Sequence, residues 1–378
     1  MSFTLLKPRR LIRIPRSNTL SHSRTFYHSS STCLNKQVRP PIGSRYLRDE
    51  ADVFTRNAWD NVVPDPESQA EVIAASLARQ RAAPVLDAAK AWCNENPHKP
   101  WDIFYKKNRD NFFKDRNWLH EEFPELVSTT RAGAGPVTVA EVGCGAGNSM
   151  FPLLAENENA ELRMLAYDYS CRAVEIVREH PLYRSPRRGT VHAEPWDLSK
   201  PTMPQGLVPG SVDIVMMLFV VHALHPSEWR QTIANVHAML KPGGKILFRD
   251  YGRYDVMQLR LKEGRLLDEN FYIRGDKTRV YFFELDELSL LFTGSKMSEA
   301  ERRITTSPGN ETGFNSMNKP TTETATPVVG GLHPSLPHDL PHPLFTTEEL
   351  GVNHRLTVNR KTQEKLHRVW LQGKFVKL

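Results

Sequence analysis

The chain has little cysteine, and its cysteines are not arranged to hold a metal or to form a disulfide framework. Cys33, Cys93, Cys144 and Cys171 lie far apart and show no CxxC or Cys/His spacing. Zinc sites and small disulfide-stapled domains both depend on closely spaced thiols. We therefore expect reduced thiols and no metal site.

Long apolar runs are also missing. A membrane-spanning helix needs about 20 consecutive apolar residues, whereas the longest run here, residues 212–224, suits a buried strand and its exit. We therefore expect no membrane insertion. The chain has 378 residues, of which 39% are hydrophobic and 25% charged, so it has room for one large globular domain or two ordinary ones.

Acidic residues are absent from the first 48 positions. This leader contains ten Lys or Arg, so the rest of the chain carries a net charge of about −3 although the total is +7. A basic, Ser- and Arg-rich leader with scattered leucines and isoleucines is typical of a mitochondrial transit peptide. We therefore expect a mitochondrial location. The alternative is a disordered basic arm that contacts RNA phosphates in a cytoplasmic protein.

The next part of the chain, residues 49–132, has the pattern of a helical preamble. Asp65 precedes Pro66 as a helix cap would, and apolar residues follow at helical spacing through residue 86. A second helix is predicted over residues 101–113. From residue 133 the pattern changes to β-rich runs at 137–142, 162–167, 190–193, 212–219 and 245–249, separated by helices. This alternation predicts an α/β domain with a doubly wound, mainly parallel sheet.

The predicted domain is interrupted once. Residues 294–344 contain seven prolines, many threonines and little periodic hydrophobicity, which predicts a disordered insertion. Beyond it, residues 352–358 and 369–376 alternate like the two strands of an antiparallel hairpin. The α/β domain is therefore expected to comprise residues 133–293 and 345–378.

A glycine loop follows the first predicted strand of this domain. Glycine after a buried strand allows a sharp turn and a close approach to a ligand. Asp168 lies at the end of the next strand, where a carboxylate can accept hydrogen bonds from both hydroxyls of a ribose. A second acid, Asp197, follows the third strand. The loop itself reads Glu141-Val142-Gly143-Cys144-Gly145-Ala146-Gly147-Asn148.

This loop resembles the first motif of class I methyltransferases, which use S-adenosylmethionine (SAM), and it departs from the GxGxxG pattern of dinucleotide-binding proteins. The resemblance implies a Rossmann-like fold with a seven-stranded sheet and an antiparallel C-terminal hairpin. It also implies SAM as the cofactor. The candidate cofactor contacts are Glu141, Gly143, Cys144, Gly145, Gly147, Asn148, Asp168, Asp197 and Phe219.

Candidate catalytic residues follow the fourth and fifth strands, because reactants lie at the carboxyl ends of the strands in open α/β sheets. Arg249, Asp250 and Tyr251 are the candidates, since rings can stack on a planar acceptor while a carboxylate balances positive charge. Asp250 is equally suited to cap a helix. His222 and His225 lie nearby, but we assign no catalysis to them.

More specific motifs flank these sites. Trp101-Asp102-Ile103-Phe104-Tyr105, Asn111-Phe112-Phe113-Lys114-Asp115-Arg116-Asn117-Trp118, Phe248-Arg249-Asp250-Tyr251-Gly252 and Arg368-Val369-Trp370-Leu371-Gln372-Gly373-Lys374-Phe375 are similar to the signature of the tRNA 3-methylcytidine methyltransferase family. Asn57-Ala58-Trp59-Asp60-Asn61 resembles the branch that acts mainly on threonine tRNAs. The insertion and the leader depart from the family pattern.

The resemblance implies methylation of N3 of a cytidine in the anticodon loop, expected at position 32, of threonine and also serine tRNAs. It leaves open whether an aminoacyl-tRNA synthetase is a partner. The alternatives are a class I methyltransferase of a protein or small molecule, and a SAM-fold RNA-binding protein without catalysis. The expected tRNA contacts are Trp101, Phe104, Tyr105, Lys106, Lys107, Phe112, Phe113, Lys114, Arg116, Asn270, Phe271, Tyr272, Arg274 and Arg279.

Overall fold

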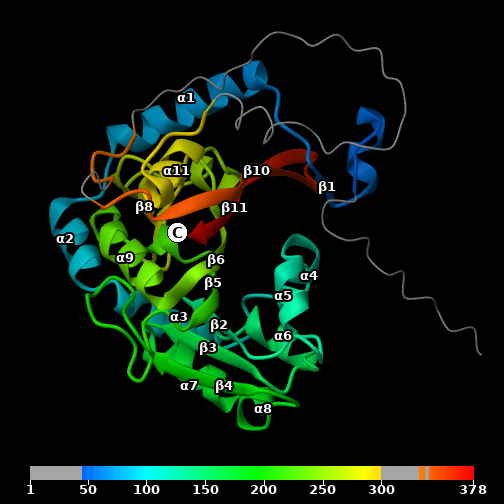
Figure 1. Ribbon diagram of the computed structural model, residues 1–378. Coiled ribbons are helices and arrows are strands. Elements are labelled where there is room, and N and C mark those ends of the chain that lie inside the picture. Colours follow the sequence, from blue (N-terminus) through cyan, green and yellow to red (C-terminus); the bar gives the residue numbers. More distant parts are fainter. Residues whose placement is uncertain (1–44, 299–331, 337–339) are drawn as a thin grey trace, which may run out of the picture. The chain divides into compact units, whose positions relative to one another are not determined.

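The computed structural model describes residues 45–298, 332–336 and 340–378, so the leader up to residue 44 lies outside the described residues (Figure 1). Short elements precede the α/β domain. In chain order they are η1 (Glu50–Thr55), β1 (Ala58–Asp60), α1 (Pro66–Ala82), α2 (Asp87–Glu95), α3 (His98–Asn108), α4 (Leu119–Glu122) and α5 (Pro124–Thr129).

The two predicted helices of the preamble exist, but both end earlier than the pattern indicated. Asp65 caps α1 as expected, because its carboxylate accepts a hydrogen bond from the backbone N–H of Ser68 at 2.9 Å. The helix ends at Ala82, since the residue before Pro84 is disfavoured in the helical conformation. The second helix, α3, ends at Asn108 because Arg109 has a φ of 51°.

The main sheet has eight strands in the order β1-β10-β11-β6-β5-β2-β3-β4. Strands β4 (Thr190–Pro195), β3 (Leu162–Asp168), β2 (Val137–Val142), β5 (Val212–Leu218) and β6 (Leu240–Tyr251) run parallel. β10 (Phe345–Asn359) and β11 (Glu364–Lys377) form the predicted antiparallel hairpin, which is longer than expected. The sheet therefore has the predicted doubly wound α/β architecture, with its strand order reversing at β2.

The eighth strand corrects the expected count of seven and the purely helical interpretation of the preamble. β1 pairs antiparallel with β10, with Trp59 opposite Leu356. The Trp59 ring is buried against Val53, Leu356 and Val358. The preamble is therefore built into the edge of the sheet through an aromatic side chain that the helical pattern did not reveal.

Helices cover both faces of the parallel strands. Alternate residues of β2 point to opposite faces: Val139 packs with α6 (Met150–Ala155), and Ala140 belongs to the cluster that includes α9 (Trp229–Met239) and α11 (Leu285–Thr293). The remaining elements are α7 (Cys171–Glu179), α8 (Pro181–Arg184), η2 (Val221–Ala223), η3 (Pro226–Glu228), α10 (Val256–Leu259), β7 (Leu266–Asp268), β8 (Phe271–Ile273) and β9 (Arg279–Tyr281). In the described part of the chain, no helix is long and apolar enough to cross a membrane.

The predicted disordered insertion, residues 294–344, is only partly open to comparison, because 299–331 and 337–339 lie outside the described residues. Its described ends are packed. Leu336, Leu340 and Leu344 are buried in the core beside α11, and the backbone N–H of His333 donates a hydrogen bond to Glu287 at 3.2 Å. The predicted insertion was therefore too long at its C-terminal end, because these leucines are core residues.

Candidate active site

The glycine loop turns sharply out of β2. Gly143, Gly145 and Gly147 have φ values of 68°, 55° and 86°, which a residue with a side chain adopts only with strain. A Cβ at Gly145 would lie 2.4 Å from the hydroxyl oxygen of Tyr105. Cβ atoms at the other two would strike Val220 and Phe151 at 2.4 and 2.3 Å. The glycines thus make room for protein side chains that close over the loop.

Asp168 ends β3 beside this loop. Its carboxylate accepts hydrogen bonds from the backbone N–H groups of Gly145 at 2.8 Å and Ser170 at 2.9 Å. Burial raises the pKa of Asp168 to about 6, although these two hydrogen bonds oppose the rise. Each oxygen keeps a second lone pair, so the carboxylate can still accept a hydrogen bond from a ligand hydroxyl.

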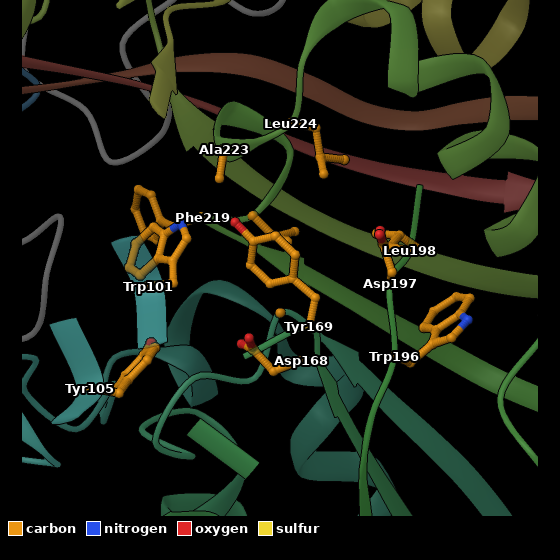
Figure 2. Close-up of a pocket in the computed structure, with 12 residues that line it drawn as sticks. Trp101, Tyr105, Asp168, Tyr169, Trp196, Asp197, Leu198, Phe219, Ala223 and Leu224 are labelled. Carbon is orange, nitrogen blue, oxygen red and sulfur yellow. The ribbon is translucent and has the colours of Figure 1, made fainter. Parts of the chain in front are cut away.

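Asp168 lies at one side of a pocket of about 530 Å³ that is open to solvent and that we call the main pocket (Figure 2). Trp101 and Tyr105 reach it from α3, and Trp196 and Asp197 reach it from the loop after β4. The segment after β5 covers the opposite side. The complete lining is Trp101, Tyr105, Gly143, Asp168, Tyr169, Trp196, Asp197, Leu198, Phe219, Val220, Ala223 and Leu224.

Four of the predicted cofactor contacts line the main pocket, namely Gly143, Asp168, Asp197 and Phe219. Gly145 and Gly147 shape the loop without lining it. Two expectations are corrected. Cys144 is only 4% exposed and packs into the core, and the Asn148 amide donates a hydrogen bond to Asp115 at 3.1 Å, which ties the loop to the preamble.

Sequence reasoning missed half of the pocket wall. Tyr169 and Trp196 adjoin the predicted acids Asp168 and Asp197, so aromatic residues beside those acids were the available signal. The Tyr169 hydroxyl donates a hydrogen bond to the carbonyl of Pro97 at 3.0 Å, which fixes the ring against the segment before α3. The other missed residues, Leu198, Val220, Ala223 and Leu224, are apolar residues without a distinctive pattern.

Arg116 and Glu141 lie behind the glycine loop. Glu141 is 1% exposed, and burial raises its pKa to about 7 while the positive charge of Arg116 opposes the rise. Arg116 donates hydrogen bonds to Ser149 Oγ at 3.0 Å and to the carbonyl of Leu218 at 3.1 Å. The structure therefore corrects two expectations: Glu141 does not line the main pocket, and Arg116 supports the loop instead of presenting its charge to tRNA.

Asp250 is fully buried, which corrects both expectations for it. Its carboxylate accepts hydrogen bonds from the backbone N–H and the ring Nδ1 of His222 and from the backbone N–H of Tyr251. It lies within β6, so it is not the N-cap residue of a helix, and it does not line the main pocket. Burial lowers the pKa of His222 although the charge of Asp250 opposes the shift. Nε2 of this buried ring has no hydrogen-bond partner among the described residues.

The other two catalytic candidates both lie on β6, the strand next to β11. Tyr251 packs its ring 5.1 Å from that of Phe219 and 4.9 Å from that of His222, and so extends the aromatic wall of the main pocket. Arg249 is 4% exposed and lies over the rings of Trp118 and Trp370 at 4.7 and 5.1 Å. Burial lowers its pKa to about 10. Arg249 is therefore a packing residue outside the main pocket, which corrects its expected catalytic position.

The small sheet of β7, β8 and β9 buries most of the tRNA contacts expected there. Phe271 is fully buried, and Tyr272, Asn270 and Arg279 are 2%, 2% and 3% exposed. Arg279 donates hydrogen bonds to the carbonyl of Ala223 and to Glu228, both at 3.0 Å, so it supports the segment after β5. These four expectations are corrected. Arg274 remains beside the main pocket, with its guanidinium 5.4 Å from the Trp101 ring.

The preamble divides its expected contacts between core and solvent. Phe104 and Tyr105 are 7% and 5% exposed and pack together in a small aromatic cluster. Phe112 is 60% exposed, and Phe113 is half-buried. Lys106, Lys107 and Lys114 are exposed. The three lysines are thus accessible to a polyanion. Phe104 is a core residue, so the expectation that it contacts tRNA was wrong.

Comparison with known proteins decides between the alternatives that the fold leaves open. A methyltransferase domain model matches residues 140–246. The tRNA N(3)-methylcytidine methyltransferase of Schizosaccharomyces pombe is 37% identical over 340 residues, which cover 90% of this chain and 93% of that protein. The chain belongs to the tRNA 3-methylcytidine methyltransferase family.

Other relatives of this methyltransferase agree. The tRNA(Thr) (cytosine(32)-N(3))-methyltransferase of Saccharomyces cerevisiae is 43% identical over 336 residues, which are 88% of this chain but only 45% of the yeast protein. The tRNA N(3)-cytidine methyltransferase METTL2 of Danio rerio is 35% identical, covering 71% of this chain and 83% of that protein.

SAM is the cofactor of this methyltransferase, and the main pocket fits it. The Asp168 carboxyl, whose pKa is raised by burial, suits hydroxyl donors on a positively charged ligand. The pocket lies where the strand order reverses, at the carboxyl ends of β2, β3 and β5. Its rings at Trp101, Trp196 and Phe219 provide flat walls for an adenine.

Proposed function

We propose that this protein transfers the methyl group of SAM to N3 of a cytidine in tRNA and forms 3-methylcytidine. The observation that carries the proposal is the aromatic wall that joins the cofactor pocket to a second flat surface: Phe219 lines the main pocket, and Tyr251 lies 5.1 Å from it. Membership of the tRNA 3-methylcytidine methyltransferase family supplies the substrate class.

The acceptor base must be unpaired when it reacts. In a paired helix the N3 atom of cytosine lies on the Watson–Crick edge, so the enzyme takes a loop base that is already unpaired or flips one out. We infer that the substrate cytidine lies in the anticodon loop, at position 32, and the number in the printed name of the budding-yeast relative supports that position. Threonine tRNAs are the expected substrates, with serine tRNAs next, and the name of the budding-yeast relative supports the first.

The reaction needs orientation more than acid–base catalysis. Neutral cytosine carries no proton on N3, so its lone pair attacks directly. Bound SAM would supply an electrophilic methyl group on a positively charged sulfur. Tyr251 and Phe219 would stack on the base, and Trp101, with Arg274 over its ring, also lines the main pocket. Holding the two reactants in line can account for roughly 7–11 kcal/mol of the barrier.

The methylated base carries a positive charge. Asp250 is a buried carboxylate that directly precedes Tyr251 of the aromatic wall in the sequence. Because Asp250 is fully buried, it acts through His222. Its hydrogen bond fixes the orientation of the His222 ring, which lies 4.9 Å from the Tyr251 ring. We assign Asp250 and His222 as positioning residues that hold Tyr251 and stabilise positive charge beside it.

Exposed basic residues of the preamble would hold the tRNA backbone. Lys106 and Lys107 lie in the last turn of α3, and Lys114 follows in the loop toward α4. Arg360 and Lys361 are exposed at the turn between β10 and β11. Contacts from such residues to phosphates give affinity that depends on salt and not on sequence.

A direct assay tests the proposal. Purified protein, tritiated SAM and total tRNA should yield labelled 3-methylcytidine by nucleoside mass spectrometry, and Asp168→Ala should abolish both SAM binding and transfer. SAM binding without transfer to any tRNA would favour a non-catalytic RNA-binding protein. Transfer to protein or to a metabolite instead would favour the other alternative. Adding the cognate aminoacyl-tRNA synthetase tests whether that enzyme is a partner.

The leader supports a further proposal about location. Residues 1–48 lack acidic side chains and are rich in arginine and serine, so we propose that they direct the protein to mitochondria. A reporter fused to residues 1–48 should then accumulate in mitochondria. A purely cytosolic reporter would reject targeting and favour the basic arm.

A further inference from the structure

A second depression, which we call the side pocket, lies where the preamble meets the C-terminal hairpin. It opens to solvent, and its empty volume, which includes part of that solvent, is about 240 Å³. Its walls come from β1, α4, β6, β10 and β11, and thus join the preamble to the C-terminal hairpin. The lining residues are Asp60, Asn61, Glu122, Arg249, Asn353, His354, Arg355 and Trp370.

The charges of the side pocket are balanced within it. Arg355 donates a hydrogen bond from Nε to Asp60 at 2.6 Å. Arg249 lies 3.6 Å from a carboxylate oxygen of Glu122. Because each guanidinium already faces a carboxylate, the pocket has no excess positive charge that a phosphate would neutralise. A neutral polar ligand suits it better.

Flat cationic surfaces surround the indole of Trp370. The guanidinium carbons of Arg249 and Arg368 each lie 5.1 Å from its ring centroid, and that of Arg355 lies 5.7 Å away. Unpaired bases stack on aromatic rings and on arginine planes in RNA-binding proteins. The side pocket therefore has the kind of surface on which a nucleobase stacks.

Two ring nitrogens of the side pocket lack hydrogen-bond partners among the described residues. They are Nε1 of Trp370 and Nδ1 of His354, and both atoms are buried. Burial lowers the pKa of His354 to about 4, so its ring is neutral near pH 7. A buried polar atom without a partner is costly. The polar edge of a base, which carries both donors and acceptors, would satisfy such atoms.

The side pocket is also correctly placed beside the reaction site. Tyr251 and Trp370 are register partners in adjacent strands, and Arg368 lies over both rings, at 5.9 and 5.1 Å. Tyr251 in turn contacts Phe219 of the main pocket. A series of side-chain contacts, from Trp370 through Arg368 and Tyr251 to Phe219, therefore connects the two pockets and gives neighbouring unpaired nucleotides a path between them.

We propose that the side pocket binds a second unpaired base of the same tRNA loop while the target cytidine occupies the main pocket. This inference rests on the proposed function, because it assumes an RNA substrate. It assigns Trp370, Arg355 and His354 as binding residues that select the loop sequence. The methyl transfer itself would not pass through them.

Abasic substitution provides the test. Loop nucleotides of a substrate tRNA are replaced one at a time by abasic residues, and kcat/KM is measured with the parent enzyme and with Trp370→Phe and Arg355→Lys. In the parent, one position other than the methylated one should cost roughly five- to a hundredfold, the range of a stacked base. In both variants the same abasic substitution should cost clearly less than in the parent, because the contact is already weakened.

Controls separate this inference from the proposed function. Trp92→Phe, at an indole that is 43% exposed on α2, should behave like the parent throughout. SAM affinity should be unchanged in all variants. If the parent transfers no methyl group, the proposed function fails. The affinity of the parent and the variants for the same abasic tRNAs is then measured instead of kcat/KM. The side pocket would not be a base site if the losses from the enzyme variants and from the abasic substitutions multiplied at every loop position. The same would follow if the variants changed only the salt dependence, equally for all tRNAs.

Discussion

His222 Nδ1 lies 2.8 Å from a carboxylate oxygen of Asp250, and the backbone N–H of the same histidine donates to the other oxygen at 3.0 Å. This double contact fixes the ring. Burial lowers the pKa of His222, so the ring is neutral near pH 7, with the proton on Nδ1 and a lone pair on Nε2. The neutral ring then faces the edge of Tyr251 at 4.9 Å. Asp250 thus controls the aromatic wall from within the core.

Asp250→Ala should therefore lower both stability and turnover. Loss of the carboxylate leaves two buried N–H donors of His222 without an acceptor, which should lower the free energy of unfolding by about 2–6 kcal/mol, at roughly 1–3 kcal/mol for each donor. Chemical denaturation measures this. Asp250→Asn, which retains shape, should lower kcat more than tenfold while KM for tRNA and SAM affinity stay within about twofold.

The matched control for Asp250 is Asp87→Ala at the exposed start of α2, for which the change in unfolding free energy should stay within about 0.5 kcal/mol. A fully active Asp250→Ala enzyme would remove this residue from the mechanism. A variant with a higher KM but an unchanged kcat would show that Asp250 serves substrate binding alone.

SAM affinity should depend on pH through Asp168. Its pKa in the free protein is raised to about 6, and hydroxyl donors on a cationic ligand favour the ionised form. Below pH 6, SAM binding must therefore remove the proton from the Asp168 carboxyl. The affinity should be constant above about pH 7 and fall by up to tenfold per pH unit below 6. Calorimetry from pH 5 to pH 8 measures it.

Asp168→Asn serves as the comparison, because it cannot titrate. It should bind SAM weakly at every pH, with a nearly flat profile between pH 5 and pH 7. A parent profile that is equally flat would mean that the Asp168 carboxyl does not contact the ligand.

Glu141→Gln should stabilise the protein at alkaline pH. The carboxyl has a folded pKa raised to about 7 against an ordinary value of 4.5. A raised folded pKa favours the native state below pH 4.5, and this advantage is lost as pH rises through 7. Above pH 7 the buried charge should cost about 3 kcal/mol. Glutamine should recover part of this at pH 8 and little at pH 5, as thermal unfolding at the two values would show.

Much of the fold followed from local patterns. The parallel strands were visible because β2, β3 and β5 are mostly buried and are therefore mainly apolar in sequence. β1 was not visible, because a three-residue edge strand has no period to detect; its place depends on Trp59 packing against residues almost 300 positions later. Long-range pairing of this kind leaves no local signal.

The site was predictable where chain geometry fixed it and unpredictable where packing did. Asp168 follows a strand and necessarily reaches the carboxyl edge of the sheet. Phe271 and Arg279 have residue types common in RNA-binding surfaces, yet they are buried because β8 and β9 fold under the segment after β5. Residue type alone does not distinguish a base-stacking ring from a core ring.

Gly145→Ala should abolish SAM binding by crowding the loop. The new Cβ would lie 2.4 Å from the Tyr105 hydroxyl, at a backbone φ of 55°. Gly145→Ala combined with Tyr105→Phe should restore part of the affinity, since the hydroxyl is the closest contact. Gly135→Ala has a similar φ of 73° but open space around it, so it should show strain of about 1 kcal/mol and normal SAM affinity.

Lys106 and Lys107 provide the last prediction, which concerns tRNA affinity. Both are exposed in the final turn of α3, close in sequence to Tyr105 of the main pocket. If each neutralises one phosphate, replacing both by alanine should reduce the slope of log affinity against log salt concentration by about 2. Filter binding between 50 and 200 mM salt, chosen as roughly the range where such contacts weaken, measures the slope. Arg188→Ala is the control, because this exposed arginine precedes the amino end of β4, whereas the main pocket lies at the carboxyl ends of the strands, and the variant should leave the slope unchanged. An equal loss in the Arg188 variant would indicate general attraction to the protein surface, whereas an unchanged slope in the lysine variant would place the RNA on another face.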